Sequence, residues 1–236
     1  MSIFENIRAI TFDVAGTLLD PHPSVGETYA AALALFGHHA DSTELQRRFV
    51  RAFKQVNAGP RGGILNREGW SQIVELTFEG LCPPETLPEL FEELWLGYAR
   101  PTSWRMLPGV HEILGLLRER GYRLGILSNN DERLLGLLKA LELDVYFDAV
   151  ILSSVVGAGK PRREMFAAAE QALGVAPEHL LHIGDTPHED IAGALNAGWR
   201  VVQVGKKSAF VNERGEPTPG VPRMDGLPEL AASLAE

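Results

Sequence analysis

One aspartate in this sequence stands where a reactive carboxylate would be expected. Asp13 follows the apolar, β-branched run Ala9–Phe12, and a sharp turn through Gly16 comes next. A carboxylate at the end of a buried strand, beside a loop of free backbone N–H groups, can act as a nucleophile or hold a metal ion. Because aspartate is also common where strands simply stop, this stretch alone leaves both interpretations open.

Two further aspartates flank a turn late in the chain. Asp185 and Asp190 enclose Thr186-Pro187-His188-Glu189, just before a predicted helix. With Asp13 they would form a cluster of hard oxygen ligands suited to Mg²⁺. Carboxylates gathered this closely are costly without a cation between them. Asp190 by itself would also suit the positive end of a helix dipole.

Two more polar sites complete the set. Ser128-Asn129 follows another apolar run, and Lys160 lies in the glycine-containing loop 157–161. Glycine lets the backbone approach a ligand closely, and an ammonium group is a point charge suited to phosphate. A plain turn and a solvated surface lysine would explain each site singly. Four such features in this order at predicted strand ends are hard to attribute to chance.

The elements that must position these residues alternate regularly after residue 109. Short apolar runs alternate with amphipathic helical periods, which predicts an α/β fold with a doubly wound parallel sheet. The carboxyl ends of parallel strands share one edge, so Asp13, Ser128 and Asp185 should converge there. The predicted strands are 9–12, 122–127, 149–152, 180–183 and 200–204, and the predicted helices are 110–120, 131–141, 163–173, 190–197 and 227–234.

The region from residue 20 to 100 has a different pattern. It shows helical periods with no convincing strand, and Ser24 with Glu27 predicts a capping box at its first helix. We therefore predict a core domain of residues 1–19 and 101–236, with residues 20–100 inserted as a helical cap domain. Arg61, in the glycine-rich loop 59–63, is the expected cap residue reaching the substrate, and residues 206–225 are expected to form a surface segment.

Composition narrows the function. Of 236 residues, 45% are hydrophobic and 22% charged, so the chain can bury a substantial core. A formal net charge of −9 argues against nucleic acid as a partner. The single cysteine, Cys82, excludes an internal disulfide, and no run approaches the roughly 20 apolar residues of a membrane span. We expect a cytoplasmic protein without membrane association, either monomer or homodimer.

The sequence resembles the haloacid dehalogenase-like (HAD-like) hydrolase superfamily over nearly its whole length. The residues that carry the resemblance are four motifs in order: Asp13-Val14-Ala15-Gly16-Thr17, Ser128-Asn129, Lys160-Pro161, and Gly184-Asp185 through Asp190. The resemblance implies a Rossmann-like core with a helical cap of the first type. It also implies hydrolysis of a small phosphorylated metabolite.

The resemblance assigns roles by position. Asp13 would take the phosphoryl group as an aspartyl phosphate, assisted by Ser128 and Lys160. Mg²⁺ would be held by Asp13, the backbone carbonyl of Ala15, Asp185 and Asp190. The residues expected around the phosphate are Val14, Ala15, Gly16, Thr17 and Asn129, together with Arg61.

One position departs from this pattern. Phosphatases of the superfamily usually carry a second aspartate two residues after the nucleophile, where this chain has Ala15. A methyl group can neither protonate a leaving group nor activate water, a role typically worth 10²–10⁴-fold. The enzyme would be slow, restricted to good leaving groups such as acyl or aryl phosphates, or served by another acid. Nearby candidates for that acid are Asp20, His22 and His188.

Three other functions remain open. The chain could be a phosphate-binding or regulatory protein without turnover, which the alanine favours. It could resemble phosphonoacetaldehyde hydrolase, which has alanine here and uses a cap lysine; Lys54 is the only lysine of this cap. A 2-haloacid dehalogenase also needs no such acid, but its branch usually has tyrosine at Ala15 and lacks the acidic motif around Asp185.

Overall fold

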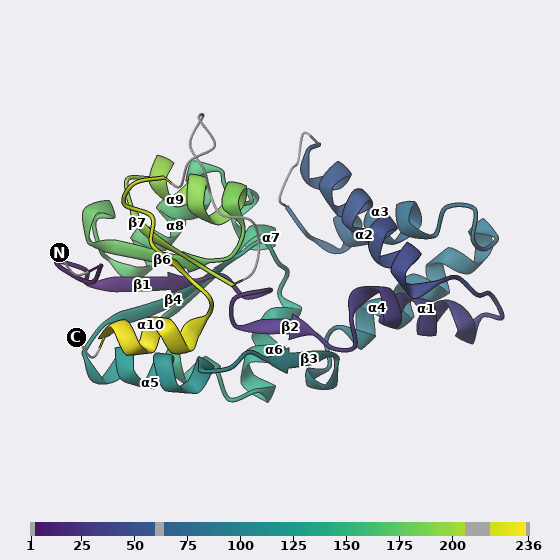
Figure 1. The fold of residues 1–236 in the computed structure, drawn as a ribbon. Helices are drawn as coiled ribbons and strands as arrows, with labels where there is room; N and C mark the ends of the chain where they lie inside the picture. Colours follow the sequence, from purple (N-terminus) through teal and green to yellow (C-terminus); the bar gives the residue numbers. More distant parts are fainter. Residues whose placement is uncertain (1–2, 60–63, 206–217, 235–236) are drawn as a thin grey trace.

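A six-stranded parallel sheet forms the centre of the larger part of the molecule (Figure 1). The computed structural model describes residues 3–59, 64–205 and 218–234. The strand order is β5-β4-β1-β6-β7-β8, and all neighbours run parallel. The α/β fold expected from the sequence is therefore confirmed. The strands of this sheet are β1 (Ala9–Phe12), β4 (Arg123–Ser128), β5 (Ala149–Leu152), β6 (Leu180–Gly184), β7 (Arg200–Val204) and β8 (Arg223–Met224).

The central strand is β1, which pairs with β4 on one side and β6 on the other. All four of its residues are buried, as a strand covered on both faces requires. In register, Phe12 lies beside Ile126 of β4 and Ile183 of β6. The three strands thus end level with one another, and the residues that follow them share one edge.

Helices cover both faces of this sheet. One apolar cluster joins β1, β4 and β6 to α5 (Val110–Glu119), α6 (Arg133–Ala140) and α10 (Leu227–Leu234). A second cluster packs α8 (Arg163–Leu173) and α9 (Gly193–Asn196) on the opposite face. The short helix α7 (Ser153–Val156) follows β5. Three layers therefore hold the sheet edge rigidly.

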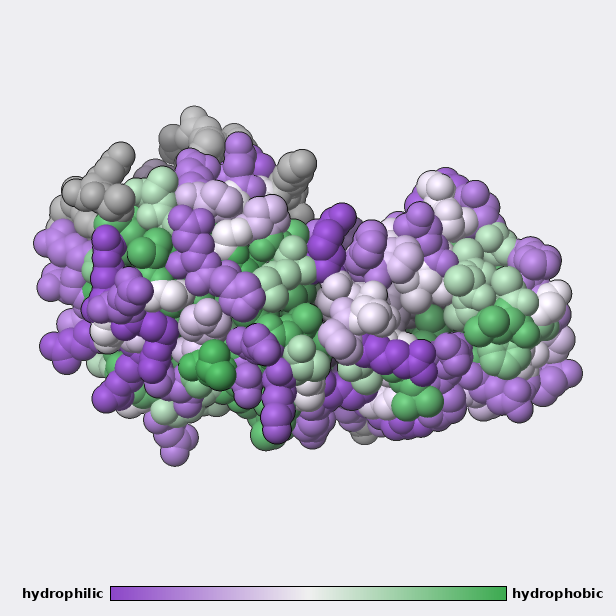
Figure 2. Space-filling model, turned by 90° about the horizontal axis from the view of Figure 1, so that it is seen from below, coloured by the Kyte–Doolittle hydropathy of each residue, from purple (hydrophilic) through white to green (hydrophobic). Residues whose placement is uncertain are grey.

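Four helices of the described residues 25–97 pack on one another in apolar clusters of their own, to the right of the sheet in Figure 1. We call them the helical cap: α1 (Val25–Leu35), α2 (Ser42–Asn57), α3 (Arg67–Phe78) and α4 (Leu87–Gly97). The capping box at Ser24 and Glu27 is confirmed. On the face drawn in Figure 2, hydrophilic and hydrophobic residues alternate over both parts.

A two-stranded ribbon connects the cap to the sheet, contrary to the prediction of an all-helical region from residue 20. β2 (Leu19–Pro21) pairs antiparallel with β3 (Trp104–Met106). Each strand has only three residues, too few for an alternating pattern to show in the sequence. The chain passes from the sheet to the cap along β2 and returns along β3, and the ribbon pairs these two segments. Paired residues lie 83 or more positions apart in sequence.

Other element boundaries also differ from prediction. Residues 223–224 form β8, although 206–225 was predicted as a surface segment; this strand depends on β7, a partner distant in sequence. The predicted helix 190–197 is instead a π-helical segment, Pro187–Ala192, followed by α9. The N–H of Ile191 reaches the carbonyl of Thr186 at 3.3 Å, which widens the turn. The helix predicted from residue 131 begins at Arg133.

The described residues include the single cysteine and the helices whose length and hydropathy bear on a membrane span. Cys82 is half-buried and burial raises the pKa of its thiol, which fits a packing role. No helix in the described ranges is long and apolar enough to cross a bilayer.

Replacing Ser24 tests how firmly α1 is anchored. Its hydroxyl accepts the N–H of Glu27 at 3.3 Å, and the Glu27 carboxylate accepts the N–H of Ser24 at 2.9 Å. We expect Ser24→Ala to lower the free energy of unfolding of the cap by about 1 kcal/mol. Urea denaturation followed by tryptophan fluorescence measures it. Ser24→Thr keeps the hydroxyl and should behave like the native chain; equal losses in both variants would contradict the capping role.

Candidate active site

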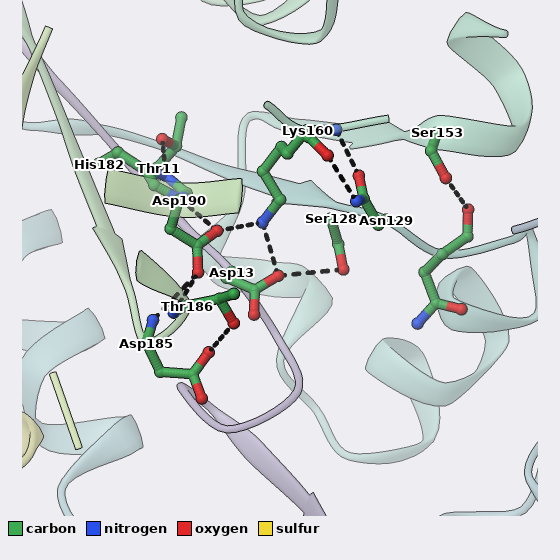
Figure 3. A network of polar contacts seen from close by, with 11 residues as sticks. Thr11, Asp13, Ser128, Asn129, Ser153, Lys160, His182, Asp185, Thr186 and Asp190 are labelled. Carbon is green, nitrogen blue, oxygen red and sulfur yellow. Dashed lines mark hydrogen bonds and ion pairs between the residues drawn. The ribbon is translucent and has the colours of Figure 1, made fainter. Parts of the chain in front are cut away.

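The polar residues singled out by the sequence meet at the carboxyl edge of the sheet (Figure 3). Asp13 follows β1, Ser128 ends β4, and Asp185 follows β6. Strands β4 and β5 extend the sheet on one side of β1, and β6, β7 and β8 extend it on the other. The direction of the strand order therefore reverses at β1. Such a switch point is where open α/β sheets bind ligands. The predicted convergence of these residues is thus observed.

The Asp13 carboxylate is held from two sides. Its Oδ1 atom accepts a hydrogen bond from Lys160 Nζ at 2.8 Å and one from Ser128 Oγ at 3.4 Å. Its backbone N–H donates to Ile183 on the neighbouring strand at 2.9 Å. Asp13 is only 8% exposed. The carboxylate therefore has one fixed orientation, with Oδ1 engaged.

Lys160 is fully buried between two carboxylates. Its Nζ lies 2.8 Å from Asp13 Oδ1 and 2.6 Å from Asp190 Oδ1. Burial opposes the charged ammonium, but these two carboxylates outweigh burial and raise the pKa of Lys160 above its usual value. The lysine is thus a permanent positive charge at neutral pH, not a solvated surface residue.

Asn129 fixes the backbone of that lysine. Its amide Oδ1 accepts the N–H of Lys160 at 2.6 Å, and its Nδ2 donates to the carbonyl of Lys160 at 3.0 Å. We predicted Asn129 as a phosphate-binding residue. Its side-chain amide clamps the Lys160 loop to the end of β4, because both ends of the amide are engaged there. A contact from its backbone to phosphate stays a prediction.

Asp190 lies deepest in the network. Its Oδ1 contacts Lys160 and, at 3.1 Å, His182 Nε2; its Oδ2 accepts the N–H groups of Asp185 and Thr186 at 3.1 and 2.8 Å. Burial opposes its charge, but Lys160 and the His182 hydrogen bond prevail and hold the pKa of Asp190 well below its usual range. Gly184 makes room for it, since a Cβ there would lie 2.4 Å from Asp190 Cγ.

Three carboxylates gather at this point. Ligand oxygens of Asp13, Asp185 and Asp190 lie within 4.8 Å of one another, and all three residues are buried. Lys160 balances one of their negative charges, so a divalent cation fits the remainder. The donor set is all oxygen, which suits Mg²⁺. The carbonyl of Ala15, predicted as a further ligand, stays a prediction.

The loop after Asp13 is tightly wound. The carbonyl of Val14 accepts the N–H groups of Thr17, Leu18 and Leu19 at 3.2, 2.8 and 2.9 Å. Gly16 has a φ of +89°, and a Cβ on it would lie 2.2 Å from Asp185 Oδ2. Only glycine therefore fits at this position. Among the described residues, Thr17 is buried with no hydrogen-bond partner for its hydroxyl.

A cavity of about 1120 Å³ opens from these residues toward the helical cap. Ala15 is exposed and lines it. Of the candidate substitutes for the missing acid, His188 lines the cavity, whereas Asp20 pairs with Arg105 at 3.8 Å on the ribbon and His22 is exposed outside it. Lys54 also lines the cavity. Arg61 lies outside the described residues.

Sequence reasoning missed two supporting residues. His182, fully buried in β6, contacts Asp190 through Nε2, and its Nδ1 pairs with Thr11 Oγ1 at 2.8 Å. A polar pair in two otherwise apolar strands was the available signal. Arg133 was missed as well: it pairs with Asp131, donates to the carbonyl of Trp95 at 2.8 Å and stacks on the Trp95 ring, which joins α6 to the cap.

Comparison with known proteins agrees with this geometry. The chain matches the haloacid dehalogenase-like hydrolase family over residues 7–198. It belongs to that family. The human haloacid dehalogenase-like hydrolase domain-containing protein 3 is 31% identical, over 97% of this chain and 92% of the human protein. A glyceraldehyde 3-phosphate phosphatase of Pyrococcus abyssi is 38% identical over a shorter stretch, 42% of each chain.

Solved structures of HAD-like hydrolases share the fold. A HAD phosphatase from Thermococcus onnurineus aligns with a TM-score of 0.64 at 24% identity, covering 97% of this chain and 98% of its own. The L-2-haloacid dehalogenase of Xanthobacter autotrophicus, with chloropropionic acid covalently bound, aligns at 0.72 with 21% identity and similar coverage, 97% and 98%. Both phosphatases and dehalogenases therefore have this fold, and the chemistry must be argued from the site.

Removing the charge of Asp190 tests the buried network. We expect Asp190→Asn to lower the free energy of unfolding by about 3 kcal/mol at pH 7, since Lys160 loses one of its two buried partners. The folded-state pKa of Asp190 lies below the unfolded value of about 4, so its stabilisation is present above that value and is lost as pH falls below it. Denaturation curves from pH 8 to 3 should show the difference from the native chain shrinking in acid.

The matched control is Glu119→Gln, which removes an exposed carboxylate from the end of α5. Surface changes of this kind usually alter stability by less than about 0.5 kcal/mol. A pH-independent loss in Asp190→Asn would contradict the electrostatic explanation.

Proposed function

We propose that this HAD-like hydrolase is a Mg²⁺-dependent phosphatase that acts on a small phosphorylated metabolite through an aspartyl phosphate at Asp13. The observation that supports it most is Lys160, buried between Asp13 and Asp190 beside a cluster of three carboxylates. Phosphoryl transfer requires chiefly positioning and neutralisation of the phosphate oxygens. A fixed carboxylate, a permanent ammonium and a cation site supply both.

Asp13 acts as the nucleophile. Lys160 and Ser128 both bind its Oδ1 atom, which leaves Oδ2 to attack phosphorus. The ammonium of Lys160 and the hydroxyl of Ser128 lie close enough to contact phosphoryl oxygens as well. The P–O bond to the leaving group breaks with its electron pair on the leaving oxygen, which takes a proton from water. A water molecule then attacks the aspartyl phosphate, which releases inorganic phosphate and restores the Asp13 carboxylate.

Mg²⁺ would be held by Asp13, Asp185 and the carbonyl of Ala15, where it neutralises charge on the phosphate oxygens. Asp190 is expected behind the cation, because its oxygens already accept from Lys160, His182 and two backbone N–H groups. Its role is to hold Lys160 and the 185–186 backbone in place.

A phosphate-binding or regulatory protein without turnover is the second candidate. Ala15 favours it, because the usual acid and base is missing at an exposed position of the cavity. Lys54 lines the same cavity, as a phosphonoacetaldehyde hydrolase would require of a cap lysine. A dehalogenase has no use for three clustered carboxylates, so the acidic cluster argues against that activity.

Hydrolysis assays test the proposal directly. We expect the native chain to release phosphate from 4-nitrophenyl phosphate with Mg²⁺ and to lose this activity with EDTA. Asp13→Asn should reduce kcat by at least about 10³-fold, because no nucleophile remains. Full activity in Asp13→Asn would exclude the aspartyl phosphate, and activity without any divalent ion would exclude the metal role.

Restoring the missing acid gives a sharper test. We expect Ala15→Asp to raise kcat for alkyl phosphates by roughly 10²- to 10⁴-fold, the usual contribution of general acid–base catalysis. Aryl phosphates should gain less, since a phenolate leaves without a proton. Ala15→Asn has similar size and no acid, and should gain nothing. Equal rates in both variants would mean that Ala15 is not what limits turnover.

A further inference from the structure

The cavity above Asp13 has two chemically different ends. At the sheet edge it is lined by Asp13, Ser128, Asn129 and Lys160, the groups suited to a phosphoryl unit. The opposite walls come from the helical cap and are mainly apolar. A phosphate ester placed with its phosphorus at Asp13 would extend its leaving group into this second region.

Aromatic side chains dominate the cap walls, among them Tyr29, Phe49, Phe53, Trp70, Trp95 and Tyr98. Four of these rings form a continuous series: Tyr29 and Phe49 lie 5.5 Å apart between centroids, Phe49 and Phe53 5.8 Å, and Phe53 and Trp70 6.2 Å. The series runs from α1 across α2 to α3. Tyr29, at one end, is buried and stacked on Phe78, whereas Phe49, Phe53 and Trp70 are half-buried at the cavity. An aromatic ligand in the cavity would contact this half-buried part of the series.

Val50 shows that this apolar surface is open to a ligand. It lies on α2 within the same wall, yet its side chain is 41% exposed. Concave sites lined mainly by apolar and aromatic side chains are typical of ligand pockets. A leaving group with several hydroxyl groups, such as a sugar, would find few partners here.

Lys54 is the charged side chain that the helical cap contributes to the described lining of the cavity. Arg133 is neutralised by Asp131 and covered by the Trp95 ring, 3.3 Å from its centroid. Trp70 Nε1 and the amide of Asn57 have no hydrogen-bond partner among the described residues. These atoms are themselves buried, so they leave the exposed surface of the wall mainly apolar.

The polar end of the cavity restricts the leaving group further. Ala15 lines it, so no acid stands two residues after Asp13; His188, which lines the same cavity, is the other candidate donor. A phenol has a pKa near 10, as tyrosine does, whereas the pKa of an alkyl alcohol is close to that of water, about 16. A phenolate can therefore depart with the P–O electron pair unprotonated and take its proton from water afterwards, while an alkoxide cannot leave easily.

We infer that the ligands of this site are aryl phosphates: phosphate esters of a phenol that carries a bulky, mainly apolar aromatic group. The inference rests on the proposed phosphatase activity for its turnover, and on the cavity for its selectivity. Asp13 Oδ2 bonds to phosphorus, the P–O bond to the phenol breaks, and water hydrolyses the aspartyl phosphate. The products are the phenol and inorganic phosphate.

Three esters separate the effect of the apolar wall from the effect of the leaving group on selectivity. 1-Naphthyl and phenyl phosphate have similar leaving groups and differ in apolar size, whereas cyclohexyl phosphate resembles phenyl phosphate in size but leaves as an alkoxide. We expect kcat/KM to be at least tenfold higher for naphthyl than for phenyl, and at least 100-fold higher for phenyl than for cyclohexyl. Similar values for all three would overturn the inference while leaving the phosphatase in place.

A charge in the wall provides the structural test. Val50→Glu should remove most of the naphthyl preference by lowering kcat/KM for 1-naphthyl phosphate more than for phenyl phosphate. Leu35→Glu is the matched control: it places the same charge at a 69% exposed leucine of the cap, outside the residues that line the cavity. Equal effects of the two variants would show that the wall does not select the ligand.

Binding distinguishes failure of this inference from failure of the phosphatase. 1-Naphthylphosphonate and methylphosphonate cannot be hydrolysed, and their affinities follow from calorimetry with Mg²⁺ present. We expect the naphthyl compound to bind at least tenfold more tightly, and Val50→Glu to abolish the difference. If that preference is seen with no ester turned over, the ligand class stands and the proposed hydrolysis is wrong. Equal affinities overturn the ligand class whatever the turnover.

Discussion

Three carboxylates within 4.8 Å of one another, shielded from water, repel each other strongly unless positive charge lies among them. Lys160 supplies part of that charge by contacting Asp13 and Asp190 at once. Most other features of the sheet edge serve this arrangement. Asn129 fixes the lysine backbone, His182 and two backbone N–H groups engage Asp190, and Gly184 leaves the space that Asp190 fills.

The same arrangement links stability to the proposed chemistry. Three carboxylates and one lysine leave an excess of negative charge, which favours binding of a divalent cation. The cation would in turn attract a negatively charged phosphoryl group. The rigid three-layer core allows this, because strands β1, β4 and β6 end level and cannot shift separately. The polar edge is therefore organised before any substrate arrives, as electrostatic catalysis requires.

The helical cap provides a contrast. Its walls over the cavity are aromatic and mainly apolar. Among its described contacts with the core are the hydrogen bond and stack of Arg133 on Trp95 and the bond from the N–H of Leu65 to Ser153 Oγ at 3.4 Å. Recognition of the leaving group and activation of the phosphate thus come from separate parts of the chain. Ala15 lies where the two meet.

The sequence by itself determined the parallel sheet, the chain order of Asp13, Ser128, Lys160 and Asp185, and the missing acid at Ala15, because these depend on local apolar runs and on residues near in sequence. The tertiary structure alone decided which oxygen each group contacts: Asn129 proved to clamp Lys160, and His182 to support Asp190. The ribbon, strand β8 and the aromatic walls of the cavity were likewise decided there. Each pairs segments far apart in the chain, where no local pattern records the partner.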